Sequence, residues 1–313
     1  MLYAPVQPMH IPDNFLSIII SMICWAITIV TLGVAISRTN KTLGERQVPL
    51  MGVMAAFIFA AQMINFPVAG GTSGHLLGGA LAAITLGPWA GMLVMTAVIA
   101  VQGLLFQDGG LVVMGANILN MGLVTVALGY GLYRSVIGQS RIAKLTAAGI
   151  AAWLSVLAGA LLTSLELWLS GTAKLQLVIP AMLGIHALIG LGEALVTVAA
   201  LSFILRTRPD LLGEQSASAQ GGRGWVVAGV LIALAVVLLS PFASANPDGL
   251  ERVAINMGFI QTGQPAPYQI IPDYTIPFLG ATPLSTIVAG AVGVIIVSAI
   301  VFMAGRSLQT RKS

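Results

Sequence analysis

The chain has 313 residues, of which 57% are hydrophobic and only 8% are charged. Soluble proteins carry about 25% charged residues, so this composition excludes an ordinary water-soluble domain and a disordered chain. A single cysteine, Cys24, excludes an intrachain disulfide. Uncharged runs recur at the length of about 20 residues that a membrane-spanning helix needs. The sequence therefore predicts an all-α polytopic membrane protein.

Apolar runs and the residues that interrupt them predict nine spans. They lie near residues 14–37, 49–66, 75–87, 88–106, 111–133, 145–169, 178–205, 225–243 and 283–304. The third span is short and ends at Gly87 and Pro88. We expect it either to cross the membrane obliquely or to form a partial helix that lines a cavity.

The basic residues predict the orientation of these spans. If the N-terminus lies outside, twelve of the 14 basic residues fall in connections that lie inside. They are Arg38, Lys41, Arg46, Arg134, Arg141, Lys144, Arg206, Arg208, Arg223, Arg306, Arg311 and Lys312. The positive-inside rule therefore predicts an outer N-terminus and a cytoplasmic C-terminus. It also explains the pI of about 9.5 as an orientation signal, so no nucleic-acid partner is expected.

A polar stretch at residues 209–224 is rich in glycine, serine and glutamine, as flexible linkers are. It predicts two modules. Residues 9–208 form a bundle of about seven helices, and residues 225–313 form two helices around an external loop at residues 244–282.

Motifs of common enzymes are absent from the sequence. It contains no G-x-x-x-x-G-K-[ST] phosphate loop and no H-E-x-x-H, C-x-x-C or G-x-S-x-G motif. We therefore expect a protein that is not an enzyme and does not itself hydrolyse ATP. The missing H-E-x-x-H motif also argues against an intramembrane metalloprotease.

Two histidines fall on the predicted outer side of the first module. His10 precedes the first span, and His75 follows a glycine-rich stretch at residues 70–74. Imidazole binds nickel, cobalt, copper and zinc, and glycines leave room for an ion, so the pair is a candidate metal site. Spacing alone also allows two helix-end histidines that meet lipid headgroups or water.

Polar residues within the spans are further candidates. His186 and Glu193 lie seven residues apart on one helical face and form either a structural hydrogen-bonded pair or a polar relay. Glu166, near the outer end of the sixth span, is expected to reach the membrane interface. Asn117 and Asn120 are spaced i to i+3, so they bind substrate or, as is commoner, form interhelical hydrogen bonds.

Several long segments carry a resemblance to a known family. In chain order they are MHIPDNFLS, NFPVAGGTSGHLLGGALAAITLGPWAG, LLFQDGGLVVMGANILNMG and HALIGLGEALVT. They resemble the CbiM/NikM family, the substrate-binding components of energy-coupling-factor transporters for cobalt and nickel. The resemblance covers most of residues 9–205. The later segment ANPDGLERVA resembles the PDGLE or NikN-type domain that is often fused to this family.

The resemblance implies a planar nitrogen site for the metal. Its ligands would be the α-amine of Met9, the amide and ring of His10, and the ring of His75. The supporting residues would be Asn65, Ser73 and Gly74. Such a donor set favours Ni(II) over Co(II). Residues 1–8 would turn the Met9 amine into an amide, so we expect translation to start at Met9 or these residues to be removed. If they persist, we expect a weaker site built from His10, His75 and nearby carbonyls.

The resemblance also implies a function. It is the high-affinity uptake of nickel or cobalt across a bacterial or archaeal cytoplasmic membrane, with the metal as substrate and no tightly bound cofactor. The partners would be a transmembrane coupling component, cytoplasmic ATPase subunits and membrane lipid. Cobalt uptake would serve cobalamin synthesis. The residues alone also allow a proton-coupled secondary transporter with a relay through Glu166, His186 and Glu193.

Overall fold

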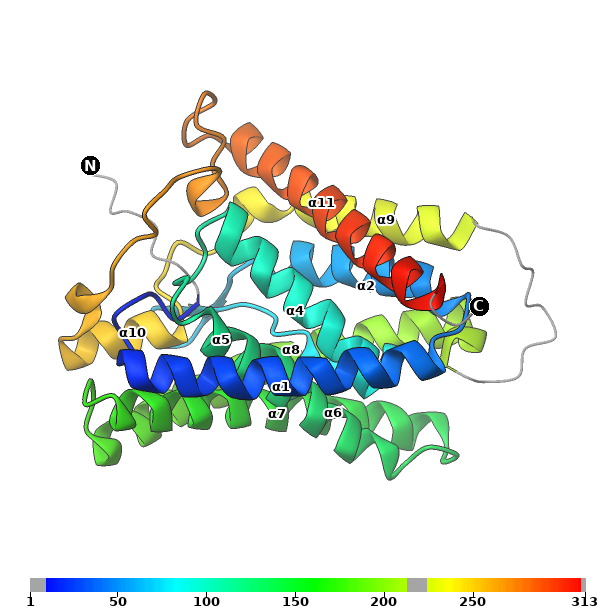
Figure 1. Ribbon diagram of the computed structural model, residues 1–313, viewed down its shortest axis with the longest axis horizontal. Helices are drawn as coiled ribbons and strands as arrows, with labels where there is room; N and C mark the ends of the chain where they lie inside the picture. Colours follow the sequence, from blue (N-terminus) through cyan, green and yellow to red (C-terminus); the bar gives the residue numbers. More distant parts are fainter. Residues whose placement is uncertain (1–9, 213–223, 311–313) are drawn as a thin grey trace.

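A computed structural model describes residues 10–212 and 224–310 (Figure 1). The first part contains α1 (Ile18–Thr42), α2 (Gln47–Gln62), β1 (Phe66–Val68), β2 (Thr72–Gly74), α3 (Gly79–Leu86), α4 (Pro88–Leu105), α5 (Met114–Asn117), the π-helix η1 (Ile118–Val124), α6 (Thr125–Arg134), α7 (Arg141–Leu169), α8 (Leu175–Thr207) and η2 (Pro209–Leu212). The second part contains α9 (Gly224–Val237), η3 (Ser240–Phe242), α10 (Gly249–Met257), η4 (Ile260–Thr262), η5 (Pro272–Tyr274) and α11 (Pro283–Thr310).

Seven helices of the described residues are long and apolar enough to cross a membrane. They cover residues 18–42, 88–105, 114–134, 141–169, 175–207, 224–242 and 283–309. The chain is thus a multi-pass membrane protein whose helices come from the apolar runs, as predicted. The nine predicted spans are too many by this measure, because the runs at 49–66 and 75–87 form the shorter helices α2 and α3.

The shortness of α3 has a local cause. Its flanking residues Gly78 and Gly87 have φ angles of 83° and 79°, which are left-handed conformations that favour glycine, and Pro88 begins α4. Every residue of α3 is buried. Of the two expectations for this run, the partial helix is the one that forms.

A short antiparallel hairpin joins α2 to α3 and was missed by the all-α prediction. Phe66 pairs with Gly74 and Val68 pairs with Thr72, around a turn in which Gly70 and Gly71 have positive φ. The adjacent glycines are the sequence signal for such a turn. The hairpin places β2 immediately before His75.

The two ends of the bundle differ in composition (Figure 1). The ends of α1, α6, α8 and α11 that carry basic residues lie together with the C-terminus at one end. The opposite end holds residues 10–17, before α1, and the connection between α9 and α11. The fold thus separates the basic connections from the candidate histidine His10.

The C-terminal segment, residues 224–310, packs against the rest of the chain. Its helices α9 and α11 both lie on α2. The connection predicted as a loop at residues 244–282 contains the helix α10, which begins with a capping box. The Asp248 carboxylate accepts from the Glu251 amide at 2.8 Å, and the Glu251 carboxylate accepts from the Asp248 amide at 2.9 Å.

Candidate metal site

The chain before α1 is fixed by polar side chains of the loop and helix that follow α4. The Asn117 carboxamide pairs with the backbone of Ile11, accepting from its N–H at 3.0 Å and donating to its carbonyl at 3.1 Å. The Asp13 carboxylate accepts from three successive amides, those of Leu111, Val112 and Val113. Asn117 therefore positions the backbone next to His10.

Asp108 holds His10 at two points. The His10 amide donates to Asp108 Oδ1 at 3.3 Å, and His10 Nδ1 lies 3.1 Å from the Asp108 carbonyl oxygen. Because a carbonyl can only accept, this contact assigns the proton to Nδ1 and leaves the lone pair on Nε2. His10 is 2% exposed, and its Nε2 has no hydrogen-bond partner among the described residues. A buried imidazole nitrogen is thus available for another ligand.

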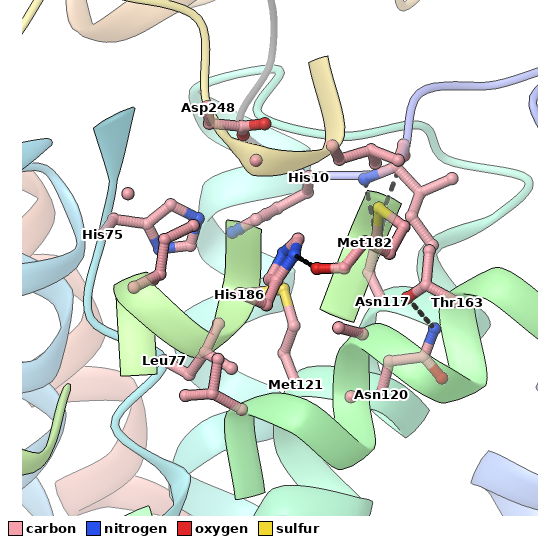
Figure 2. Close-up of a pocket in the computed structure, with 18 residues that line it drawn as sticks. His10, His75, Leu77, Asn117, Asn120, Met121, Thr163, Met182, His186 and Asp248 are labelled. Carbon is pink, nitrogen blue, oxygen red and sulfur yellow. Dashed lines mark hydrogen bonds between the residues drawn. The ribbon is translucent and has the colours of Figure 1, made fainter. Parts of the chain in front are cut away.

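His75 lies beside His10 although the two come from distant segments. Their rings meet edge to face, with centroids 5.8 Å apart. The Nδ1 of His75 lies 2.9 Å from the carbonyl oxygen of Leu76. Figure 2 shows both rings reaching the same cavity, together with the ring of His186.

Glu193 fixes the chain that follows His75. Its carboxylate, which is fully buried, accepts from the amides of Leu77 and Gly78 at 2.6 and 2.8 Å. His186, in contrast, has its Nδ1 2.7 Å from the Met182 carbonyl one helical turn earlier. In these contacts of the described chain, Glu193 and His186 use different partners and do not form the pair that their spacing predicted.

Asn120 and Glu166 form an interhelical contact. Asn120 Nδ2 donates to Glu166 Oε2 at 2.6 Å and to Thr163 Oγ1 at 3.1 Å, and the Cys24 thiol donates to Glu166 Oε1 at 3.3 Å. Glu166 is buried, so the prediction that it reaches the interface is wrong. The buried carboxylate finds its partners inside the bundle, as buried charges generally do.

The cavity between these residues has a volume of about 70 Å³, which exceeds the roughly 10–15 Å³ that one water requires. Its lining includes His10, His75, Asn117, Asn120, His186 and Asp248. Gly74 also lines it, and a Cβ there would come within 2.6 Å of Ile189. Of the other predicted residues, Ser73 and Asn65 are not among the lining residues, and Met9 lies outside the described residues.

Two imidazoles alone do not complete a metal site. Among the described residues, no group of three His, Cys, Asp or Glu side chains is arranged to hold a metal ion. A metal ion at this cavity would need donors beyond these two imidazoles. Sequence reasoning named His186 as a polar candidate but missed Asp248, because the place of Asp248 in the cavity wall depends on tertiary packing.

Acidic side chains of the C-terminal segment lie at this end of the molecule. Burial, followed by the charge of Glu251, raises the pKa of Asp248 well above its usual value. Burial also raises the pKa of Glu251 to about 7. The pKa of Asp273 is raised to about 6, first by burial and then by the charge of Asp108. A cation near these groups would stabilise their charged forms.

Comparisons with known proteins agree with this architecture. Residues 10–211 match the family model described as the cobalt uptake substrate-specific transmembrane region, and residues 223–310 match the PDGLE domain. The solved structure of a truncated transition metal transporter is 34% identical, with a TM-score of 0.57, and the match covers 63% of this chain and 99% of that one.

Relatives named as metal transport proteins match most of the chain. The putative fused nickel transport protein NikMN of Archaeoglobus fulgidus is 37% identical over 311 residues, covering 96% of this chain and all of the relative. The cobalt transport protein CbiM of Geobacter sulfurreducens is 31% identical over 237 residues, covering 72% of this chain and 67% of the relative.

The fold, the cavity and these matches define a multi-pass membrane protein of metal transport. Its two matched regions account for nearly the whole chain. The chain belongs to the CbiM/NikM family and carries a C-terminal PDGLE domain of the NikN type.

Proposed function

We propose that the chain is the metal-capture subunit of an energy-coupling-factor ABC transporter, with nickel favoured over cobalt as substrate. The observation that carries this proposal is the meeting of the buried side chains of His10 and His75 at one cavity, with ring centroids 5.8 Å apart. The names of the relatives support metal transport, and an ATP-driven transporter whose sequence has no phosphate loop needs separate ATPase subunits.

The proposed orientation places this cavity on the outer side of the membrane. The basic ends of α1, α6, α8 and α11 lie at the opposite end of the bundle, where the positive-inside rule places the cytoplasm (Figure 1). An outer cavity suits a subunit that captures its substrate before transport.

The proposed division of the chain is a metal-binding module at residues 9–208, a linker at 209–224 and a second module at 225–313.

The proposed ligands are the Met9 amine, the His10 amide and ring, and the His75 ring. A chelate that uses both the amide and the ring of His10 must use Nδ1, because only this ring nitrogen lies near the backbone. In the described structure both atoms face Asp108, at 3.3 and 3.1 Å. Metal binding would therefore exchange these Asp108 contacts for bonds to the ion. With the first eight residues in place, His10 Nε2 and the His75 ring remain as a weaker pair.

The two carboxylates that a proton-coupled transporter would need, those of Glu166 and Glu193, accept hydrogen bonds from other groups of the chain. Glu166 accepts from Asn120 and Cys24, and Glu193 accepts from the amides of Leu77 and Gly78. These contacts favour structural roles for both carboxylates over a proton relay.

Uptake of radioactive nickel by cells tests the proposed function. We expect uptake only when the chain is produced together with its coupling and ATPase subunits, and we expect His75→Ala to abolish it. Excess cobalt should compete less well than excess unlabelled nickel. Uptake that persists without the ATPase subunits and stops when the proton gradient is dissipated would instead identify a secondary transporter.

A further inference from the structure

The C-terminal segment reaches the candidate metal site through a pair of buried side chains. We propose that Asp108 and Tyr274 are positioning residues, through which the C-terminal segment sets the place of His10 and thereby the affinity for the metal. This inference rests on the proposed function, since it assumes that His10 is a ligand. It adds Asp108 and Tyr274, which the sequence analysis did not single out as candidates.

The contact runs from the C-terminal segment to His10 in two steps. The Tyr274 hydroxyl donates to Asp108 Oδ2 at 2.7 Å, and Asp108 Oδ1 accepts from the His10 amide at 3.3 Å. Tyr274 is 7% exposed and Asp108 is 3% exposed, so water competes little for either contact. The two oxygens of one carboxylate thus join the C-terminal segment to the backbone of a candidate ligand.

Tyr274 is held rigidly enough to act in this way. Its ring stacks on Phe106, with centroids 4.8 Å apart and planes inclined by 20°. The adjacent backbone is fixed as well, since the amides of Ile271 and Asp273 donate to the carbonyls of Leu105 and Phe106 at 3.0 and 3.1 Å. The φ angle of Tyr274 is 53°, a left-handed conformation that a non-glycine residue keeps only when its surroundings enforce it.

The same C-terminal segment also holds the hairpin that carries the other histidine. The Ser73 amide donates to the Pro247 carbonyl at 2.9 Å, and the Ser73 hydroxyl donates to the Asn246 carbonyl at 2.7 Å. Ser73 lies two residues before His75. One connection therefore contacts the backbone near both candidate ligands, and Tyr274 reaches His10 through a single intervening side chain.

The consequence for the metal follows from the role of Asp108. This carboxylate keeps the backbone of His10 beside the cavity before the metal binds, so that the metal does not have to order it. Tyr274 limits where the carboxylate can move, because one of its oxygens stays bound to the hydroxyl. Without that hydroxyl, one oxygen of a buried carboxylate loses its donor and the side chain is free to rotate. Groups that orient metal ligands in this way typically contribute about 10–100-fold to metal affinity.

The test is a nickel titration of the purified protein, in whichever form binds nickel more tightly, the 313-residue chain or the chain that begins at Met9. We expect Tyr274→Phe to weaken nickel binding by about 10–100-fold and to change the ligand-field absorption of bound nickel. Tyr268→Phe is the matched control, because the Tyr268 hydroxyl donates to the Leu104 carbonyl at 2.9 Å from the same connection. It should change affinity by less than about threefold, since it loses one exposed hydrogen bond.

A second pair of variants separates positioning from folding. Asp108→Ala should weaken binding at least as much as Tyr274→Phe. Asp108→Asn should retain more affinity, because its amide oxygen can still accept from His10 while its NH₂ group donates to Tyr274. Tyr274→Phe with wild-type affinity and an unchanged spectrum would overturn the proposal, as would an equal loss in Tyr268→Phe. A wild-type protein that binds neither nickel nor cobalt would instead overturn the proposed function.

Discussion

Replacing His75 by alanine will weaken nickel binding by about 100-fold or more in protein that begins at Met9. The ring of His75 supplies one of the proposed nitrogen donors, and the described residues near the cavity offer no acidic or thiol cluster to replace it. Metal sites of about four ligands bind with roughly 10–16 kcal/mol, so one ligand accounts for about 3 kcal/mol, or roughly 100-fold. Competition titration with a chelator of known affinity measures the change.

His186→Ala is the matched control for this variant, because it removes a second imidazole from the same cavity. His186 has its Nδ1 against the Met182 carbonyl and is not a proposed ligand. Its loss should weaken binding by less than about tenfold, the lower bound of the effects of groups that surround metal ligands. Equal losses in both variants would show that the cavity as a whole matters, and not the ring of His75 as a ligand.

A chain that begins at Met9 will bind nickel about 100-fold more tightly than the 313-residue form. In the shorter chain the Met9 nitrogen is an amine with a lone pair, whereas in the longer chain it is an amide that offers none. The difference again corresponds to one ligand, or about 3 kcal/mol. Titration of both purified forms under the same conditions gives the ratio.

A chain with one additional residue before Met9 distinguishes the amine from the length of the extension. It lacks the first eight residues but still has a peptide bond at the Met9 nitrogen. We expect it to bind as weakly as the 313-residue form. Tight binding by this variant would mean that the amine of Met9 is not a ligand, and that the extension acts in some other way.

Hydropathy predicted the spanning helices well, because each helix that crosses a membrane needs its own apolar stretch of about 20 residues. The runs that form α1, α4, α7 and α8 are long and poor in charged residues, and each forms a long helix. The runs of α2 and α3 were wrongly predicted to form membrane spans. Their lengths are set by the hairpin between them and by the left-handed glycines Gly78 and Gly87, which act on the backbone and leave the hydropathy unchanged.

The candidate site was predictable in part. The sequence placed His10 and His75 on one side of the membrane, and the structure brings their rings together. Their role as ligands stays a prediction. Asp108 and Tyr274 could not be found in this way, because their partners lie 98 and 166 residues away along the chain and no local pattern marks such a contact.

The most direct test of the central claim is nickel X-ray absorption spectroscopy on protein that begins at Met9 and is loaded with one equivalent of the metal. The claim predicts a planar environment of four nitrogen donors, with the outer-shell scattering that imidazole rings produce. His75→Ala should reduce the imidazole contribution. A six-coordinate environment rich in oxygen, without imidazole scattering, would contradict the assignment of His10 and His75 as ligands and place the metal elsewhere.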